Sequence, residues 1–207
     1  MKKNYQKELD KLIEEIPKGQ APRLLLHACC APCSSYVLEY LSKYFAITVY
    51  YYNPNISEES EYIKRINELK RLIKEMPLDN AVEFVEGDYD PKVFFEMAKG
   101  MEDLPEGGER CYHCYELRMR EAARLAAEKG YDYYTTTLSI SPHKNVDWIN
   151  EIGERLATQY AVHHLPSDFK KRDGYKRSIQ LSEEYSLYRQ NYCGCVYSKN
   201  VVKSKEV

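Results

Sequence analysis

The chain has 207 residues, of which 43% are hydrophobic and 30% are charged, with a formal net charge of −2 at pH 7. These values fit a globular protein of one domain, residues 1–207, and they exclude a chain-wide positive field for nucleic acid. No apolar run is long enough to span a membrane or to form a signal peptide after the first lysines, so we expect a cytoplasmic protein without a membrane partner.

Helical patterns and apolar strands alternate along the chain. We expect a leading helix within residues 1–20, at about 4–17, and a C-terminal tail over residues 187–207 that carries a Cys-x-Cys pair. Strands are expected from apolar, β-branched or aromatic runs at residues 24–30, 46–52, 81–86, 131–138 and 161–165. Further helices are expected at residues 34–44, 58–76, 91–98, 111–129, 146–160 and 175–185. This alternation predicts an α/β fold, with a parallel sheet, right-handed crossovers and helices on both faces.

Three helix boundaries carry explicit signals. Ser57 is expected to cap the long helix that runs to about residue 76. Asp90 and Pro91 supply an N-cap and a proline at the first helical position. Gly130 is expected to stop the helix that precedes it.

The strands end in polar or thiol-bearing loops. In a parallel sheet the carboxyl ends of the strands form one edge, and open α/β folds bind their ligands there. We therefore expect these loops to converge at that edge, at residues 29–30, 53–55, 88–90, 138–144 and 166–171. No glycine-rich phosphate loop follows the first strand, so the expected occupant of that position is a metal cofactor and not a nucleotide.

The seven cysteines form three clusters: Cys29, Cys30 and Cys33, then Cys111 and Cys114, then Cys193 and Cys195. Four thiolates can bind zinc or hold a [4Fe–4S] cluster. The adjacent pair Cys29-Cys30 is atypical of zinc sites, so the spacing favours a redox metal cluster over structural zinc and over inert buried cysteines. The tail sequence Cys193-Gly194-Cys195 is too tight for a relaxed disulfide. It indicates an exchangeable redox pair, ligands of a second metal, or incidental thiols in a flexible tail.

Two further stretches combine charge with hydroxyl or aromatic groups. Residues 135–144 end a strand with hydroxyls and then reach Ser141, His143 and Lys144, which either hold an anion or only cap the next helix. The densest basic run, residues 168–178, either follows an RNA backbone or forms a solvated charged face. Its cations are Lys170, Lys171, Arg172, Lys176 and Arg177.

Between about residue 24 and residue 197 the chain carries a series of specific stretches: His27-Ala28-Cys29-Cys30-Ala31-Pro32-Cys33, Tyr52-Asn53-Pro54-Asn55-Ile56, Glu61-Tyr62 with Arg65, Gly87-Asp88-Tyr89, Gly108-Glu109-Arg110-Cys111-Tyr112-His113-Cys114 and residues 136–144, 168–178 and 187–195. In these stretches the chain resembles the QueH-type epoxyqueuosine reductases. The resemblance implies an α/β fold related to adenine-nucleotide-hydrolase (HUP-like) domains without their phosphate loop. It also implies a [4Fe–4S] cluster, a neighbouring single metal ion expected to be iron, and the last step of queuosine biosynthesis. In that step, epoxyqueuosine at the anticodon wobble position of tRNA is reduced from an epoxide to a cyclopentene.

This resemblance gives the thiols roles. The ligands expected for the cluster are Cys29, Cys30, Cys111 and Cys114. Deoxygenation of an epoxide needs two electrons and two protons, whereas a [4Fe–4S] cluster passes one electron at a time. We therefore expect an external electron donor and a second redox centre. The remaining thiols, Cys33, Cys193 and Cys195, either bind the second metal or cycle between dithiol and disulfide, and both readings stay open.

His143 is expected to donate a proton to the epoxide oxygen, unless it only caps the helix at Asn145. Substrate contacts are expected from strand-end loops, the basic run and the tail, at Asn53, Asn55, Ser141, Lys144, Lys170, Lys171, Arg177, Tyr188, Arg189, Gln190 and Tyr192. The alternatives are a zinc- or ATP-dependent tRNA-modifying enzyme, a metal-independent thiol–disulfide oxidoreductase using the tail cysteines, and a pure tRNA-binding module. The missing phosphate loop argues against ATP.

Overall fold

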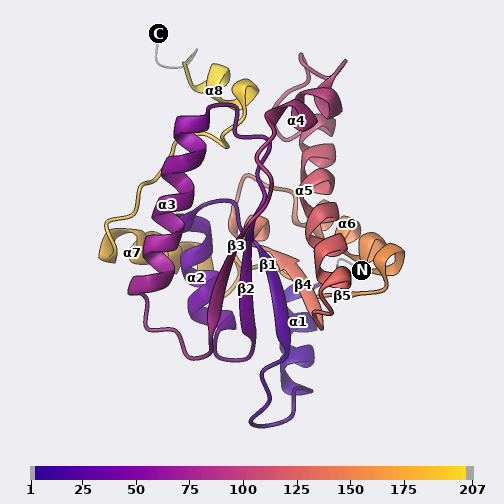
Figure 1. Ribbon diagram of the computed structural model, residues 1–207, viewed down its shortest axis with the longest axis vertical. Helices are drawn as coiled ribbons and strands as arrows, with labels where there is room; N and C mark the ends of the chain where they lie inside the picture. The colour runs from indigo at the N-terminus through magenta and orange to yellow at the C-terminus, as the bar shows by residue number, and fades with distance from the viewer. Residues whose placement is uncertain (1–2, 204–207) are drawn as a thin grey trace.

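The computed structural model describes residues 3–203, so residues 1–2 of the leading segment and 204–207 of the tail lie outside the described part. A five-stranded parallel sheet lies at the centre, in the order β3-β2-β1-β4-β5 (Figure 1). The strands are β1 Arg23–His27, β2 Ala46–Tyr51, β3 Val82–Glu86, β4 Tyr133–Thr136 and β5 His163–His164. The helices are α1 Tyr5–Glu14, α2 Ala31–Leu41, α3 Glu59–Glu75, α4 Pro91–Ala98, α5 Glu109–Glu128, the 3₁₀ helix η1 Thr137–Ile140, α6 Val146–Tyr160, α7 Gly174–Glu184 and α8 Val196–Lys203.

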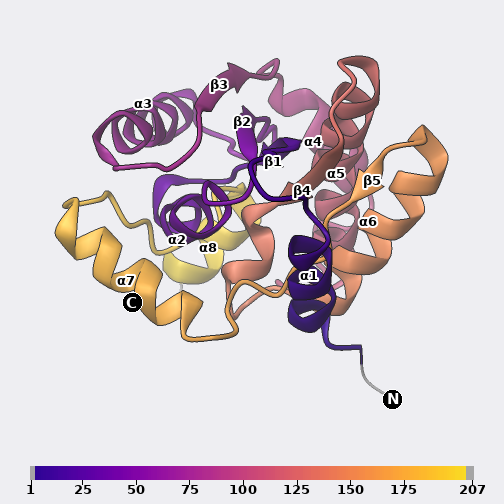
Figure 2. The same ribbon diagram turned by 90° about the horizontal axis from the view of Figure 1, so that it is seen from below.

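The sheet separates two hydrophobic cores. Helices α2, α3 and α7 cover one face, and α5 and α6 cover the other (Figure 2). Successive side chains of β1 point to opposite faces, so Leu24 and Leu26 join the first core and Leu25 joins the second. The expected α/β fold, with a parallel sheet and helices on both faces, is confirmed. Among the described helices, none is both long and apolar enough to cross a membrane.

His27 connects the carboxyl ends of three strands. Its Nδ1 lies 2.8 Å from the Thr136 hydroxyl, and its Nε2 lies 3.0 Å from the carbonyl oxygen of Tyr52. Burial, together with the positive charge of Arg118, lowers the pKa of His27 to about 4, so the ring is neutral at pH 7. Because β1 ends at His27 and α2 begins at Ala31, three residues make the whole connection. This short connection holds two thiols at the carboxyl edge of the sheet.

Several predicted strand and helix ends were wrong by a few residues. The leading helix ends at Glu14 and not at 17, because the residue before Pro17 is disfavoured in the helical conformation. The fourth strand ends at Thr136, whose hydroxyl accepts a hydrogen bond from the amide of Leu138 and so starts η1. The fifth strand covers two residues only, since its predicted N-terminal part includes the left-handed C-cap of α6 at Ala161.

Three helix starts also differ from the sequence prediction. Cys30 is the N-cap of α2, with Pro32 in the first turn, so this helix begins at residue 31 and not at 34. Helix α5 begins at Glu109, directly after the extended Gly108. Ser57 does not cap α3, which begins at residue 59, because the Ser57 hydroxyl donates instead to the carbonyl of Gly194.

The C-terminal segment forms a helix that the sequence analysis did not predict. Helix α8 lies near the N-terminal ends of α3 and α4 (Figure 1). Lys199 pairs with Glu58, and the ring of Tyr197 packs near Phe94 with 6.1 Å between ring centroids. These contacts dock the tail over the carboxyl edge of the sheet, so its two thiols are held in the fold. The proposed division of the chain into a single domain with a leading helix and a tail stays a prediction.

Candidate functional site

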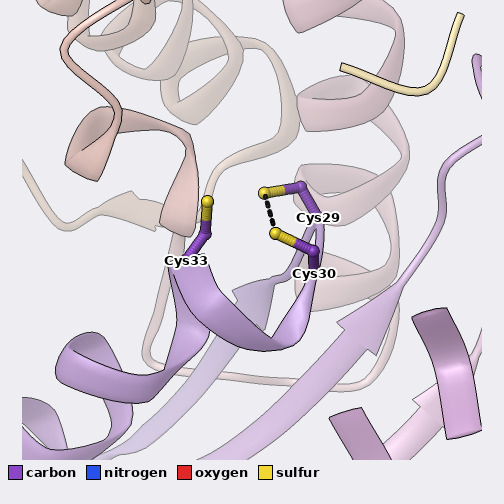
Figure 3. Close-up of side chains that lie close together, drawn as sticks. All are labelled: Cys29, Cys30 and Cys33. Atoms are coloured by element: carbon purple, nitrogen blue, oxygen red, sulfur yellow. Dashed lines mark hydrogen bonds between the residues drawn. The ribbon is translucent and has the colours of Figure 1, made fainter. Parts of the chain in front are cut away.

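Three thiols lie close together in the connection between β1 and α2 and in the first turn of α2 (Figure 3). The sulfur atoms of Cys29, Cys30 and Cys33 all lie within 4.8 Å of one another, and those of Cys29 and Cys30 are 3.8 Å apart. Cys33 belongs to the first turn of α2, where unpaired backbone amides favour negative charge. Hydrogen bonds from Cys30 and Cys33 hold the pKa of Cys29 well below its usual range, whereas the same bonds raise the pKa of those two thiols. The arrangement suits a thiolate site that can bind a metal.

Thr137, the first residue of η1, positions Cys29. Its hydroxyl oxygen accepts a hydrogen bond from the Cys29 amide at 3.3 Å and lies 3.5 Å from the Cys29 sulfur. Thr137 is fully buried at the start of η1. The β4–η1 junction therefore fixes the thiol at the end of β1.

The other four cysteines gather from two distant segments. Cys111 and Cys114 come from the start of α5, Cys193 and Cys195 come from the tail, and all four line one small cavity of about 30 Å³. The Gly107 amide donates to the Cys111 sulfur, and the Ser198 amide donates to the Cys195 sulfur. Burial raises the pKa of Cys114 to about 11 and that of Cys195 to about 12, and the nearby Cys193 adds to both effects.

The two thiol groups share one continuous site. A larger pocket of about 810 Å³ is lined by Cys29, Cys30, Cys33 and Cys193. It shares Glu106, Arg118, His143, Lys144 and Cys193 with the small cavity. All seven cysteines therefore line two adjoining cavities. Of the strand-end loops expected to converge, residues 29–30, 53–55 and 138–144 contribute to the lining, whereas residues 88–90 and 166–171 do not. The structure groups Cys111 and Cys114 with the tail thiols, so the four-cysteine cluster ligation remains a prediction.

Arg65 holds the tail against α3. Its Nη1 donates to the carbonyl of Cys193 at 3.1 Å, and its Nε donates to Glu61 at 2.7 Å. The guanidinium also lies 5.3 Å from the centre of the Tyr192 ring. Gly194 takes a φ of +114°, and a Cβ there would come within 2.9 Å of Ile56 and 3.2 Å of Arg65. A glycine between the two tail thiols is therefore required by the docked conformation.

Buried cations surround the thiols. Arg65 and Arg118 are 2% and 1% exposed, and both line the larger pocket with Lys144. Burial lowers the pKa of Lys144, but the nearby thiols Cys193 and Cys29 more than offset this effect, so its pKa is raised overall. The Nη2 atoms of both arginines are buried and lack a hydrogen-bond partner within residues 3–203. This set of donors fits an anionic group, as a thiolate-bound iron–sulfur cluster is.

Most of the predicted substrate residues lie at this site. The larger pocket is lined by Ser141, His143, Lys144, Arg189, Gln190 and Tyr192, and the small cavity by Asn55. Asn53 is buried and supports the site from behind, donating to the Ala28 carbonyl and accepting from Arg118. His143 is exposed at the rim of both cavities, whereas Asn145 itself caps α6 by accepting from the amides of Asp147 and Trp148. The helix cap therefore does not need the His143 side chain.

Other predicted substrate residues line neither cavity. Helix α7 packs against α2, so Arg177 binds Glu39 through both Nε and Nη2. Lys170 pairs with Asp168 at 2.7 Å, and Arg172 pairs with Asp10. Tyr188 donates its hydroxyl to Glu61. Lys171 and Lys176 are exposed on the outer surface. Contact of this run with RNA stays a prediction.

Sequence reasoning missed the roles of three charged residues. Arg118 follows Cys111 and Cys114 by seven and four residues, a spacing that places all three on one face of α5 and was readable from the sequence. Arg65 depends on a contact to the tail 128 residues away, for which the sequence carries no local signal. Glu106 accepts from Ser198 and joins the loop before α5 to α8.

Comparisons with known proteins show the family of this chain. A family model described as Epoxyqueuosine reductase QueH matches residues 24–201. The Epoxyqueuosine reductase QueH of Staphylococcus epidermidis is 44% identical over 200 residues, which cover 94% of this chain and 84% of the relative. The protein of that name from Streptococcus pyogenes is 42% identical over 205 residues, which cover 96% of this chain and 80% of the relative.

A solved structure with a similar fold is the U34-tRNA thiolase NcsA from Methanococcus maripaludis, determined with its [4Fe–4S] cluster. Its TM-score is 0.51 and its identity 13%, over 94% of this chain and 68% of that chain. At that identity the likeness supports the fold alone, and the expected relation to HUP-like domains stays a prediction. The family match covers most of the chain, including every cysteine that lines the two cavities. The chain belongs to the epoxyqueuosine reductase QueH family.

Proposed function

We propose that this chain reduces epoxyqueuosine in tRNA to queuosine with the help of a thiol-bound [4Fe–4S] cluster and a second metal, expected to be iron. The observation that carries the proposal is the convergence of all seven cysteines on two adjoining cavities in a chain of the QueH family. The larger pocket, about 810 Å³, is large enough to admit a nucleoside. Because its proposed substrate is a tRNA, we expect the reaction to take place in the cytoplasm.

Two assignments of the cluster ligands are consistent with the thiol positions. The predicted set joins Cys29 and Cys30 to Cys111 and Cys114 across the two cavities. The grouping of the sulfur atoms favours a second assignment, in which Cys29, Cys30 and Cys33 serve one centre and the remaining four thiols serve the other. Both assignments expect Cys111→Ser to lose the cluster and Cys33→Ser to keep it, so these two variants serve as common controls and do not separate the assignments.

The two assignments differ for Cys195→Ser and Cys29→Ser. The predicted set expects the cluster to persist in Cys195→Ser and to be lost in Cys29→Ser. The assignment based on the positions of the sulfur atoms expects the opposite result for each variant. Measured iron, sulfide and visible absorbance of anaerobically reconstituted protein therefore decide between them. The likeness to a solved [4Fe–4S] tRNA thiolase supports a cluster in this fold without choosing the ligands.

The reaction consumes two electrons and two protons, and the epoxide oxygen leaves as water while an alkene forms. A bound cluster supplies single electrons, and a second metal supplies a Lewis acid for the oxygen. The protein's own side chains bind the substrate and supply a proton to the epoxide oxygen. His143 lies at the rim of both cavities as the proposed proton donor, and the Lys144 ammonium adds positive charge where the oxygen becomes anionic. An external reductant must provide the electrons.

The substrate has to reach this pocket as a base turned out of the anticodon stack. Tyr192, Arg189 and Gln190 line the larger pocket and offer a ring and polar groups for that base. Lys171 and Lys176, exposed near α7, are proposed to contact the tRNA backbone. Arg177 is a weaker candidate because Glu39 already neutralises it.

The direct test uses tRNA that carries epoxyqueuosine, anaerobically purified protein and a chemical reductant. Nucleosides from the treated tRNA are separated and their masses are measured, and the expected product is lighter than epoxyqueuosine by one oxygen atom. Absence of conversion by protein with a full complement of iron and sulfide would refute the proposal. Conversion by metal-free protein with a dithiol reductant would favour the thiol–disulfide mechanism of Cys193 and Cys195.

A further inference from the structure

Arg118 is a buried cation at the boundary between the two thiol groups. Its side chain is 1% exposed, and it lines both the larger pocket and the small cavity. Its Nε donates to the carbonyl of Cys114 at 3.2 Å, and its Nη1 donates to Asn53 at 3.4 Å. Its Nη2 is buried and finds no hydrogen-bond partner within the described residues. The guanidinium is therefore only partly satisfied by the protein.

No carboxylate in the described part of the chain neutralises this charge. Within residues 3–203, Arg118 forms no ion pair, whereas Arg120 and Arg124 on the same helix pair with Glu116 and with Glu121 and Glu128. A buried charge without a partner is costly, so its retention needs an anionic neighbour. Burial lowers the pKa of Arg118, but Cys114, Cys193 and Cys29, which come from both thiol groups, together with Tyr115, raise it overall.

We propose that Arg118 is a positioning residue whose unpaired charge stabilises the reduced form of the metal centre held by these thiols. The inference rests on the proposed function, because it requires an iron–sulfur cluster in the site. In the couple concerned, the cluster gains one electron from the external donor, which is oxidised. A fixed positive charge in a water-poor interior favours the more negative, reduced cluster and so raises its reduction potential.

The same arginine could instead bind a phosphate of the tRNA. Its burial opposes that role, because the free Nη2 has almost no surface for a solvent-borne group to reach. Arg189, which lines the larger pocket and is exposed, is better placed for a phosphate. The charge of Arg118 therefore acts on the thiols and on the metal centre that they are proposed to bind.

The test compares Arg118→Met, Arg118→Lys and the control Arg124→Met by redox titration. Each protein is reconstituted anaerobically, its iron and sulfide are counted, and the fraction of reduced cluster is measured by electron paramagnetic resonance at fixed potentials. At the wild-type midpoint, Arg118→Met is expected to lower the ratio of reduced to oxidised cluster about tenfold, equivalent to about 59 mV for one electron. Arg118→Lys keeps the charge and should stay within about threefold, and Arg124→Met should match wild type.

The outcomes separate charge from shape. A folded Arg118→Met protein that loses its iron also supports the proposal if Arg118→Lys retains it, because the cation is then needed to hold an anionic cluster. If Arg118→Met does not fold, Arg118→Gln replaces it under the same criteria, since an amide can still donate to the Cys114 carbonyl. An unshifted potential in the charge-free variant, or equal effects of the lysine and charge-free variants, overturns the proposal. Weaker tRNA binding with an unshifted potential overturns it in favour of phosphate binding.

A different result would refute the proposed function. If wild-type protein reconstituted with iron and sulfide holds no cluster, both ideas fail together. If wild type holds a cluster and reduces epoxyqueuosine while the Arg118 variants keep its potential, the inference alone fails.

Discussion

Replacement of Arg65 by methionine should undock the tail and expose its thiols. Arg65 is 2% exposed and joins two parts of the chain, Glu61 on α3 and the carbonyl of Cys193. A hydrogen bond from a charged donor contributes roughly 1.5–3 kcal/mol. Its loss should raise the population of the undocked tail about ten- to hundredfold, since each 1.4 kcal/mol is a factor of ten. The Glu61 carboxylate would also lose its cation, and a broken buried pair costs about 3–5 kcal/mol of global stability.

The assay labels metal-free, reduced protein with iodoacetamide and follows each cysteine by mass spectrometry. Cys193 and Cys195 should react about ten- to hundredfold faster in Arg65→Met, whereas Cys29 should keep its rate because its loop does not depend on the tail contact. The control is Arg71→Met, which removes another arginine of α3 that pairs with Glu68 and Glu75 and donates to the carbonyl of Tyr185.

Unchanged labelling of the tail thiols in Arg65→Met would refute the reasoning, as would an equal rise at Cys29. The double variant Glu61→Gln/Arg65→Met gives a second check. It removes the unpaired carboxylate, so the free energy of unfolding measured in urea should partly recover, while fast labelling of Cys193 should persist. Recovery of both quantities together would show that the carboxylate, and not the Cys193 contact, holds the tail.

The remaining predictions concern pH, a buried histidine and RNA. His27 has a folded pKa of about 4 against an ordinary value of 6.5, so the unfolded chain binds more protons between those values; stability measured in urea should be full above pH 6.5 and fall as pH drops towards 4. His164, whose ring nitrogens both lack a partner within the described residues and whose pKa burial lowers to about 3, should tolerate His164→Leu with neutral or higher thermal stability and reduced acid sensitivity. The paired substitution Lys171→Glu/Lys176→Glu should weaken tRNA binding and reduce the slope of log affinity against log salt concentration by about one unit per lost contact. Arg177→Glu should mainly destabilise the packing of α7, because Arg177 pairs with Glu39. Unchanged affinity in the lysine variant would place the RNA on another face.

Local signals in the sequence predicted some elements to the residue. Helix α4 starts after Asp90, whose side chain accepts from the Lys92 amide, and α6 spans the predicted residues 146–160 because Asn145 caps it. Such caps act within one turn of the chain, so they can be read without a structure. The strand-end loops were also predictable, because a parallel sheet brings its carboxyl ends to one edge.

The parts that were not predicted depend on contacts between distant segments. The partners of Cys111 and Cys114 became evident only when the tail was seen to dock on α3 through Arg65 and Gly194. The basic run was a similar case. Its charges predicted contact with RNA. The packing of α7 on α2 pairs Arg177 with Glu39, and no local pattern in the sequence indicates this pair.

The N-terminus of α2 links the fold to its chemistry. In nucleotide-binding α/β folds, the turn after the first strand brings a helix N-terminus to a phosphate, because its free amides and dipole favour negative charge. Here the same turn carries Cys29 and Cys30, and Cys33 lies in the first turn of the helix. The N-terminus of α2 therefore still favours negative charge, which here is on thiolate sulfur and not on phosphate. Arg65, Arg118 and Lys144 add positive charge around it, so a chain with a net charge of −2 holds a locally cationic pocket at the place where the proposed reaction would deliver electrons and form an anionic oxygen.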